Sequence, residues 1–360
     1  MYGSAARSGL RIAVLLLVSP AFATGASTAS AAPSAVPASA ASAAGPVSGP
    51  ATTAEPGAVS AAVRDAATGL PARACVRLVP VERDRYTQIY LGEWQLGRYG
   101  RCSDPDGTLL VENVEPGRYQ LFVYLPYDEQ RYGQQWVGRY GGTGQRQRAA
   151  VIRVRSGATT AAPQIRLDPP GEITGTVTAA ATGQPVRGVY VGLVPMVPDP
   201  KYTPDVAITE ADGRYTVGRL GPYDWALQFS GPQIATQWSG GVGNSLLART
   251  VRVRSGGSTT LDQPLRGATV VRGSVLVDEL HNYSPVIAFN AVTGDVAGVE
   301  YVGDTYQLPV LPGQMIKLRC DCGSGAGRWH PTGEVFSAAT AVWVGRAPIT
   351  VDFDMTVTGG

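Results

Sequence analysis

The sequence predicts an all-β protein in which three two-sheet β-sandwich modules follow one another along the chain. The main observation is that one segment occurs twice, at 106–123 and at 212–229, with its Asp-Gly pair, apolar positions and proline in register. An internal repeat spaced by about a hundred residues is typical of an array of small domains. Apolar and polar residues also alternate along many short segments, and the chain contains 45 glycines and 27 prolines. Both features favour short strands and turns over helices.

Residues 1–23 have the pattern of a secretory signal peptide. Arg7 and Arg11 precede the apolar run 12–18, which leads into the small-residue sequence 21–23, Ala-Phe-Ala. A charged start, a short apolar core and an Ala-x-Ala exit are the parts of such a signal. We therefore expect a secreted, extracellular mature chain that does not insert into a membrane.

Residues 24–57 are expected to form a disordered linker. They are almost entirely Ala, Ser, Thr, Pro, Gly and Val, with Glu55 as the only charged residue. Such a segment buries too little apolar surface to offset the entropy that it would lose on ordering.

The folded modules are expected to share a common plan. Each opens with a strand that carries Gly-x-Val and closes with a strand in which apolar and charged residues alternate. The Asp-Gly pairs at 106–107 and 212–213 predict β-hairpins, because both central positions of the favoured two-residue turn need a positive φ. In the third module Gly303-Asp304 replaces Asp-Gly, which makes it a degenerate copy. The expected boundaries are 58–170, 171–266 and 267–360.

These motifs together resemble the carboxypeptidase regulatory-like domain. The matching features are Gly-x-Val, Thr-Gly-x-Pro at 68–71 and 182–185, and Asp-Gly followed by Val-x-x-Val/Leu-x-Pro from Asp106 and Asp212. The resemblance covers the first two modules well and the third loosely. It implies an Ig/transthyretin-like sandwich, grouped with starch-binding-like carbohydrate-binding folds, and a non-catalytic extracellular module.

The four cysteines predict disulfide bonding, because an even number in an exported chain favours it. Cys75 and Cys102 both fall in the first module, on strands that a hairpin could join, so we expect them to pair. Cys320 and Cys322 would then close a small ring or stay reduced. A metal site there is the weaker alternative, because two thiols supply only two ligands.

No catalytic, cofactor or metal site is predicted, and the chain is not expected to be an enzyme. The only histidines are His281 and His330, and the sequence has neither a Gly-x-Ser-x-Gly nor a His-Glu-x-x-His motif. Nucleophilic triads and zinc peptidases depend on such groups. The acidic residues beside Asp106 and Asp212 allow a calcium loop as an alternative, although a turn uses the same Asp-Gly pair and calcium needs more oxygen ligands.

Aromatic residues of the first module are the candidates for ligand contact. Exposed rings stack on the apolar faces of sugars, so possible glycan contacts are predicted at Trp94, Tyr127, Tyr132 and Tyr140. Trp136 and Trp238, by contrast, recur at the same place in two repeats, which favours a role in packing.

The charge pattern narrows the possible partners. The formal net charge is +2 and no basic run occurs, which argues against nucleic acid. The expected partner is therefore an extracellular polysaccharide or a surface protein. The sequence thus indicates an adhesion, spacer or binding role at the cell surface. The alternative is a protein that binds a starch-like α-glucan, as an accessory to a glycoside hydrolase such as an α-amylase.

Overall fold

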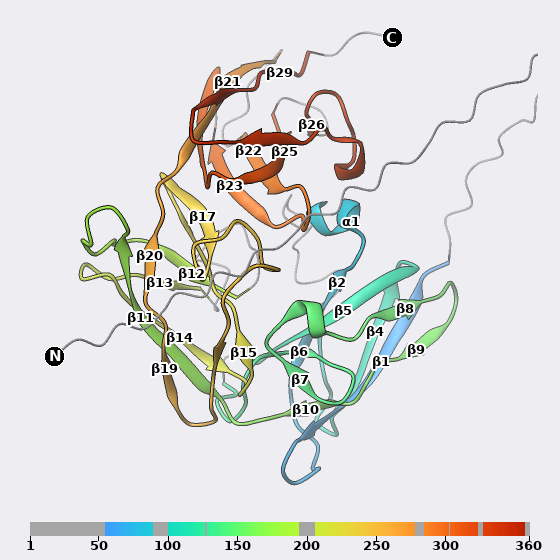
Figure 1. Cartoon of the computed structure of the whole chain (residues 1–360). Helices are drawn as coiled ribbons and strands as arrows, with labels where there is room; N and C mark the ends of the chain where they lie inside the picture. Colours follow the sequence, from blue (N-terminus) through green and yellow to red (C-terminus); the bar gives the residue numbers. More distant parts are fainter. Residues whose placement is uncertain are drawn as a thin grey trace, which may run out of the picture. The chain divides into compact units, whose positions relative to one another are not determined.

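The strands form three consecutive two-sheet sandwiches (Figure 1), which confirms the predicted fold class. The computed structural model describes residues 55–88, 100–126, 128–193, 206–277, 284–301, 303–322 and 327–356. The expected signal peptide and nearly all of the expected linker lie outside these residues. The first strand begins at Gly57, one residue before the expected start of the first module. None of the helices in the described ranges has the length and apolarity needed to cross a membrane.

The first sandwich encloses a core between two sheets of unequal size. Leu109 and Ile165 of one sheet pack against Leu121 and Val123 of the other. The smaller sheet contains β1 (Gly57–Asp65), β4 (Thr108–Val114), β9 (Thr159–Ala161) and β10 (Ile165–Leu167). The larger contains β2 (Cys75–Pro80), β3 (Gly100–Cys102), β5 (Gly117–Tyr124), β6 (Gln135–Val137), β7 (Gly142–Thr143) and β8 (Ile152–Val154). A short helix, α1 (Arg83–Gln88), and a 3₁₀ turn, η2 (Arg146–Arg148), lie outside the sheets.

The second sandwich repeats this order of strands. Its long first strand pairs with the strand after the Asp-Gly turn and with two short late strands, as β1 does with β4, β9 and β10. One sheet contains β11 (Gly171–Ala179), β14 (Arg214–Leu220), β19 (Ser258–Thr260) and β20 (Gln263–Leu265). The facing strands are β12 (Tyr190–Gly192), β13 (Ala207–Ile208), β16 (Gln228–Gly231) and β17 (Ile234–Trp238), with the separate pair β15 (Asp224–Trp225) and β18 (Val251–Arg252).

The third sandwich keeps the same plan despite its divergent sequence. Val271, Leu308 and Leu318 are fully buried between its sheets. One sheet contains β21 (Thr269–Leu276), β24 (Thr305–Val310), β28 (Ile349–Thr350) and β29 (Phe353–Asp354). The other contains β22 (Pro285–Asn290), β23 (Val296–Tyr301), β25 (Gln314–Cys320), β26 (Arg328–Trp329) and β27 (Val342–Val344). The 3₁₀ turn η3 (Phe336–Ala338) lies between β26 and β27 in the chain.

The Asp-Gly pairs do not form the predicted two-residue hairpin turns. Gly107 has φ +76°, but Asp106 is not among the residues with positive φ. Instead, Gly107 N–H donates to Asp104 O and Asp104 N–H donates to Thr108 O, which makes a three-residue hairpin loop with the glycine at positive φ. The Asp106 carboxylate accepts from Thr108 N–H. The strands on either side, β3 and β4, belong to different sheets. Asp-Gly therefore turns the chain from one sheet to the other, and its carboxylate is used by the turn itself.

A bulge marks the same position in the first two sandwiches and is missing in the third. Asn113 and Arg219 both have φ near +60°, and the pairing register shifts by one residue beside each of them. The equivalent strand of the third sandwich carries Pro309 there, and its pairing runs without a shift. Proline is locked at negative φ, so it cannot adopt the conformation that the bulge requires.

Candidate functional site

The predicted Cys75–Cys102 disulfide is present in the structure. The two cysteines face each other as paired residues of β2 and β3. Cys320 and Cys322, for which a closed ring and reduced thiols were both open, are also bonded to each other. Their side chains are buried in the core of the third sandwich. The Cys75–Cys102 bond links β2 to β3, and no free thiol remains in the described residues.

Tyr132 does not present its ring to a ligand, which corrects one of the predicted glycan contacts. The residue is only 4% exposed and packs in the core of the first sandwich. Its hydroxyl donates to Asp65 Oδ2 over 2.8 Å. The same carboxylate accepts from Thr68 N–H and Ala67 N–H through Oδ1. Tyr132 therefore ties its loop to the turn after β1.

The hydrogen bonds that the Asp65 carboxylate accepts predict an unusually low pKa for this residue. The Thr68 backbone and then the Tyr132 hydroxyl stabilise the ionised form and lower the pKa of Asp65 from 3.8 to about 2. Because the pKa is depressed on folding, the stabilisation is complete above the unfolded pKa and is lost as the pH falls toward 2. We expect an NMR titration to give a pKa near 2 in the wild type and a higher value in Tyr132→Phe. A value near 3.8 in both proteins would contradict this assignment.

The remaining predicted aromatic contacts do not assemble into a platform within the described part of the chain. Tyr140 is 87% exposed, and the Arg139 guanidinium lies 5.3 Å from its ring centre. Trp94 and Tyr127 lie outside the described residues. Of the four predicted contacts, Tyr140 alone is described with an open ring.

The recurring tryptophans pack between the sandwiches. Trp136 and Trp238 lie on the outer faces of their sheets, opposite Phe122 and Gln228 in the neighbouring strands. Trp329 on β26 is the third member of the set, which sequence reasoning missed, and it lies opposite Arg319. All three indoles are buried. Trp136 and Trp329 belong to one apolar cluster, which contains side chains from every sandwich, and Trp238 lines a cavity together with Trp136. The packing interpretation is therefore correct, but the packed surface is an interface between sandwiches.

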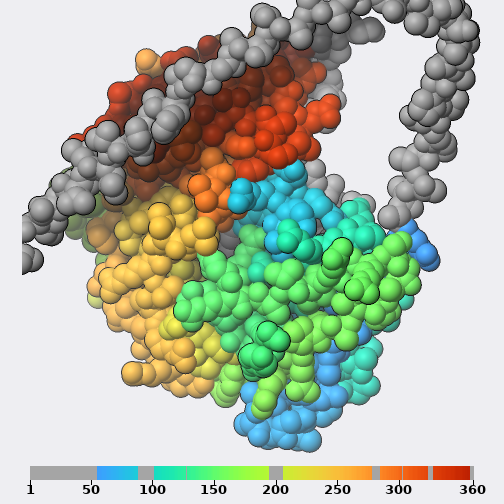
Figure 2. Space-filling model, turned by 45° about the vertical axis from the view of Figure 1, so that its right-hand side comes forward, coloured from blue at the N-terminus to red at the C-terminus, as the bar shows by residue number. Residues whose placement is uncertain are grey.

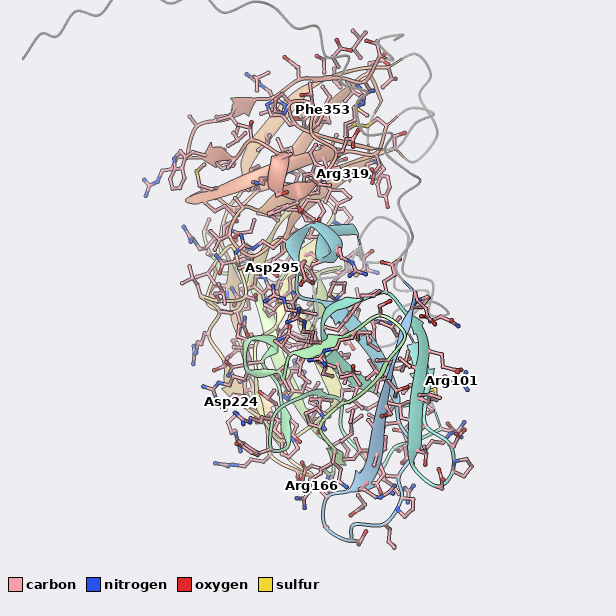
Figure 3. All side chains as sticks on the ribbon, turned by 90° about the vertical axis from the view of Figure 1, so that its right-hand side faces the viewer. Arg101, Arg166, Asp224, Asp295, Arg319 and Phe353 are labelled. Carbon is pink, nitrogen blue, oxygen red and sulfur yellow. A yellow bond between two sulfur atoms is a disulfide. The ribbon has the colours of Figure 1, made fainter. Side chains whose placement is uncertain are left out.

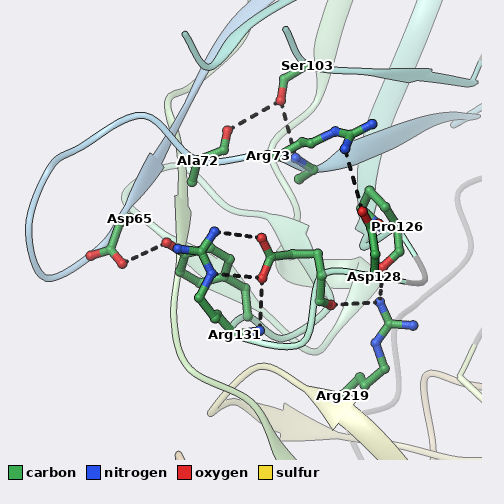
Figure 4. Close-up of polar contacts among 11 residues, drawn as sticks. Asp65, Ala72, Arg73, Ser103, Pro126, Asp128, Arg131 and Arg219 are labelled. Carbon is green, nitrogen blue, oxygen red and sulfur yellow. Dashed lines mark hydrogen bonds and ion pairs between the residues drawn. The ribbon is translucent and has the colours of Figure 1, made fainter. Parts of the chain in front are cut away.

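Polar contacts join the first and second sandwiches. Figure 4 shows the Arg219 guanidinium directed at the loop of the first sandwich, where it donates to the carbonyl oxygens of Leu125, Pro126 and Glu129. The backbones of Gln134 and Arg219 also bond to each other. Close by, the Tyr223 hydroxyl lies 2.6 Å from Asp168 Oδ2. The positive φ of Arg219 thus belongs to a residue that links two sandwiches.

The third sandwich contacts both of the others. Asp295 accepts from Ser245 N–H of the second sandwich and from the Tyr86 hydroxyl of α1. Figure 3 shows Asp295 close to α1. Asp84 of α1 accepts from the backbone and hydroxyl of Ser337, and Figure 2 shows this part of the first sandwich against the third. A cavity of about 220 Å³ lies at the junction, but its charged groups Arg146 and Asp295 already have protein partners.

A second cleft, here called the β17–β23 cleft, opens between the second and third sandwiches. It has a volume of about 200 Å³. Tyr190 and Tyr301 contribute aromatic rings from the two sandwiches, and Tyr301 is 58% exposed. The apolar lining is completed by Pro232, Ile234, Val296 and Val299. The cleft therefore offers apolar faces with partial access to solvent.

Polar groups without protein partners line the same cleft. Thr236 is 5% exposed as a whole residue, and its hydroxyl, which has no hydrogen bond to any described residue, is accessible from the cleft. The Ser230 hydroxyl is likewise unbonded within the described ranges. Glu300 is half-buried without an ion pair there, and burial raises the pKa of its carboxyl. Gln228 uses its Nε2 on Val296 O, which leaves its Oε1 as an acceptor.

Sequence reasoning missed this cleft because its residues come from two repeats. Tyr190 did carry a local signal, since it lies between the buried Val189 and Val191 at an outward position of an alternating strand. Tyr301 ends β23 and carried none. No described group of acidic, histidine or cysteine side chains could hold a metal ion, at the Asp-Gly turns or elsewhere in those ranges.

Comparisons with known proteins do not assign the chain to a family. No protein family matches its sequence, and no curated protein does. Solved structures that align with it include the Bacillus anthracis TIE protein (9% identity, TM-score 0.22, 84% of this chain and 50% of that one) and the Streptococcal ancillary pilin (9%, 0.23, 83% and 99%). GBS52, the minor pilin of Streptococcus agalactiae, aligns at 10% identity and a TM-score of 0.24, over 58% of this chain and 95% of that one. The chain thus spans half the length of the TIE protein.

Proposed function

We propose that the chain is a non-catalytic extracellular protein with an adhesion or spacer role, in which three sandwiches act as one body. The observation that carries the proposal is the apolar cluster shared by all three, since it includes Phe122, Trp225 and Phe289. Independent domains joined by linkers have small, polar interfaces and move relative to one another. A shared apolar interface instead holds the surfaces of the molecule at fixed separations, as a spacer or adhesin requires.

The expected module boundaries belong to this proposal. Within the described ranges, the ladders between named strands stay inside 58–170, 171–266 or 267–360, apart from the first residue of β1. Residues 1–23 would direct export and 24–57 would act as a tether. Detection of the mature chain in the culture medium of an expressing cell, with residues 1–23 removed, tests the location.

A single glycine tests whether the sandwiches act together. A Cβ atom on Gly133 would collide with the backbone of Leu220 and Gly221 in the second sandwich. We expect Gly133→Ala to cost about 1–3 kcal/mol, as overpacking does, and to separate the unfolding of the first sandwich from the rest. Calorimetry and limited proteolysis measure this.

Gly218→Ala is the matched control for Gly133→Ala. A Cβ atom at Gly218 meets no other atom within 4 Å, so this variant should unfold like the wild type. If Gly133→Ala also leaves the unfolding profile and the cleavage pattern unchanged, the sandwiches are independent and the one-body proposal fails.

A second candidate function is binding of an extracellular polysaccharide, including the starch-like α-glucan of an accessory protein to an α-amylase. The observation that favours it is the β17–β23 cleft, which combines the half-buried Tyr190 and the exposed Tyr301 with hydroxyl groups that have no hydrogen bond within the described residues. Retention of the wild-type chain on starch, cellulose, chitin or peptidoglycan is the direct test. Failure to bind any of the four would remove this candidate and leave the spacer role.

A further inference from the structure

The β17–β23 cleft has the size of a site for one small ring. Drug-sized ligands occupy pockets of roughly 300–1,000 Å³, whereas a cavity of about 150 Å³ holds benzene. The cleft, at about 200 Å³, therefore suits a single six-membered ring with its substituents. Because one side is open, a chain could continue from that ring into solvent.

The side chains that line the cleft indicate which kind of ligand ring would fit it. Tyr190 and Tyr301 supply aromatic faces, and Ile234 and Val299 extend the apolar surface. A ligand that fits them needs an apolar face of its own. Aromatic side chains provide large contact areas at fixed geometry and usually dominate the energy of such a contact.

The polar lining suits a ligand that carries several hydroxyl groups. Thr236 is mostly buried, and its hydroxyl, which has no hydrogen bond within the described residues, faces the open space of the cleft. A polar group in this position can bond to water or to a ligand that displaces the water. Ser230, Gln228 Oε1 and Glu300 add a second hydroxyl and two acceptors. Hydroxyl groups both donate and accept, and they satisfy this mixed set.

We propose that the β17–β23 cleft binds one neutral hexose ring of an extracellular polysaccharide, with the apolar ring face against Tyr190 and Tyr301 and the hydroxyl groups toward Thr236, Gln228 and Glu300. This inference rests on the second candidate function and assigns it to residues from two different repeats. A cationic ligand, which tyrosines and a carboxylate could also attract, would leave Thr236 and Ser230 without partners.

The test measures binding of soluble oligosaccharides to the full mature chain by calorimetry. The probes are maltotriose, cellotriose and the trimer of N-acetylglucosamine, with choline as the cationic probe. We expect one of the three sugars to bind and choline not to bind. Tyr301→Ala should then weaken sugar binding by about tenfold or more, because it removes one stacking face.

Two further variants separate the site from general effects on folding. Thr236→Val keeps the shape of the side chain and removes the hydroxyl, so we expect about two- to tenfold weaker binding, the usual range for one lost hydrogen bond. Trp343→Ala removes an aromatic ring that is as exposed as Tyr301 but lies outside the cleft, and this variant should bind as tightly as the wild type. Melting temperatures close to that of the wild type would show that all three variants fold.

The possible outcomes are distinct. Sugar binding that is kept in Tyr301→Ala, or lost equally in Trp343→Ala, would overturn the proposed site while the polysaccharide-binding function stands. Binding of choline in place of the sugars would overturn the hexose assignment. If the wild type binds none of the probes, both the site and the second candidate function fail, but the one-body proposal, tested by unfolding, is unaffected.

Discussion

The Trp329→Ala variant is expected to lower the free energy of unfolding by about 3–5 kcal/mol, the usual cost of truncating a buried aromatic side chain. Trp329 is 2% exposed, and its ring centre lies 5.0 Å from that of Phe289 and 5.3 Å from that of Phe336. Alanine would leave a cavity in the cluster that all three sandwiches share. Chemical denaturation followed by fluorescence and circular dichroism measures the change.

Trp343 provides the control in the same sandwich. It lies on β27 and is 57% exposed, so Trp343→Ala should change stability by about 0.5 kcal/mol or less, as surface substitutions usually do. Equal losses in the two variants would mean that Trp329 does not hold the interface.

The double variant Cys75→Ala/Cys102→Ala is expected to lose about 3–4 kcal/mol of stability in the chain-entropy model for a loop of this length. The disulfide closes a separation of 27 residues. Within that loop, the chain passes from β2 through α1 to β3, and α1 carries the Asp84 and Tyr86 contacts to the third sandwich. Thermal unfolding of the variant and of the oxidised wild type measures the difference.

Peptide mapping checks the premise of this prediction. It should recover Cys75 linked to Cys102, and Cys320 linked to Cys322. A linkage between Cys75 and either Cys320 or Cys322 would contradict the structure. The pair of Cys320 and Cys322 closes a much shorter loop, so its removal should stabilise the unfolded chain less through chain entropy.

The sequence predicts the fold well where the signal is local. Alternation along β5 and the repeated glycines and prolines are properties of neighbouring residues, and the strands form accordingly. The Asp-Gly turns show the limit of this reasoning, because Asp106-Gly107 fits two kinds of turn. Which turn forms depends on whether β3 and β4 pair with each other in one sheet. Their partners, β2 and β1, lie far from this turn in the sequence.

The candidate site could not be predicted, because it depends on contacts between distant segments. Tyr132 lies in an aromatic-rich segment that suggested a platform, yet Asp65, 67 residues away, holds its hydroxyl inside the protein. Tyr190 and Tyr301 lie in different repeats, and only the packing of β17 near β23 brings them to one cleft. Trp329 was missed since neither Gln nor a following x-Gly accompanies it, although its strand position is the same as that of Trp136.

The residues at the bulge position make the repeats differ in which sandwich they contact. Arg219 of the second sandwich donates hydrogen bonds to the first. The third sandwich has Pro309 at the equivalent position and lacks the bulge. The third sandwich instead forms hydrogen bonds to α1 of the first sandwich through Ser337 and Asp295. The first and third sandwiches are therefore in contact, unlike distant repeats of a solenoid, which contact only their neighbours in sequence. Loss of any one of the three sandwiches would expose apolar side chains of the cluster that they share.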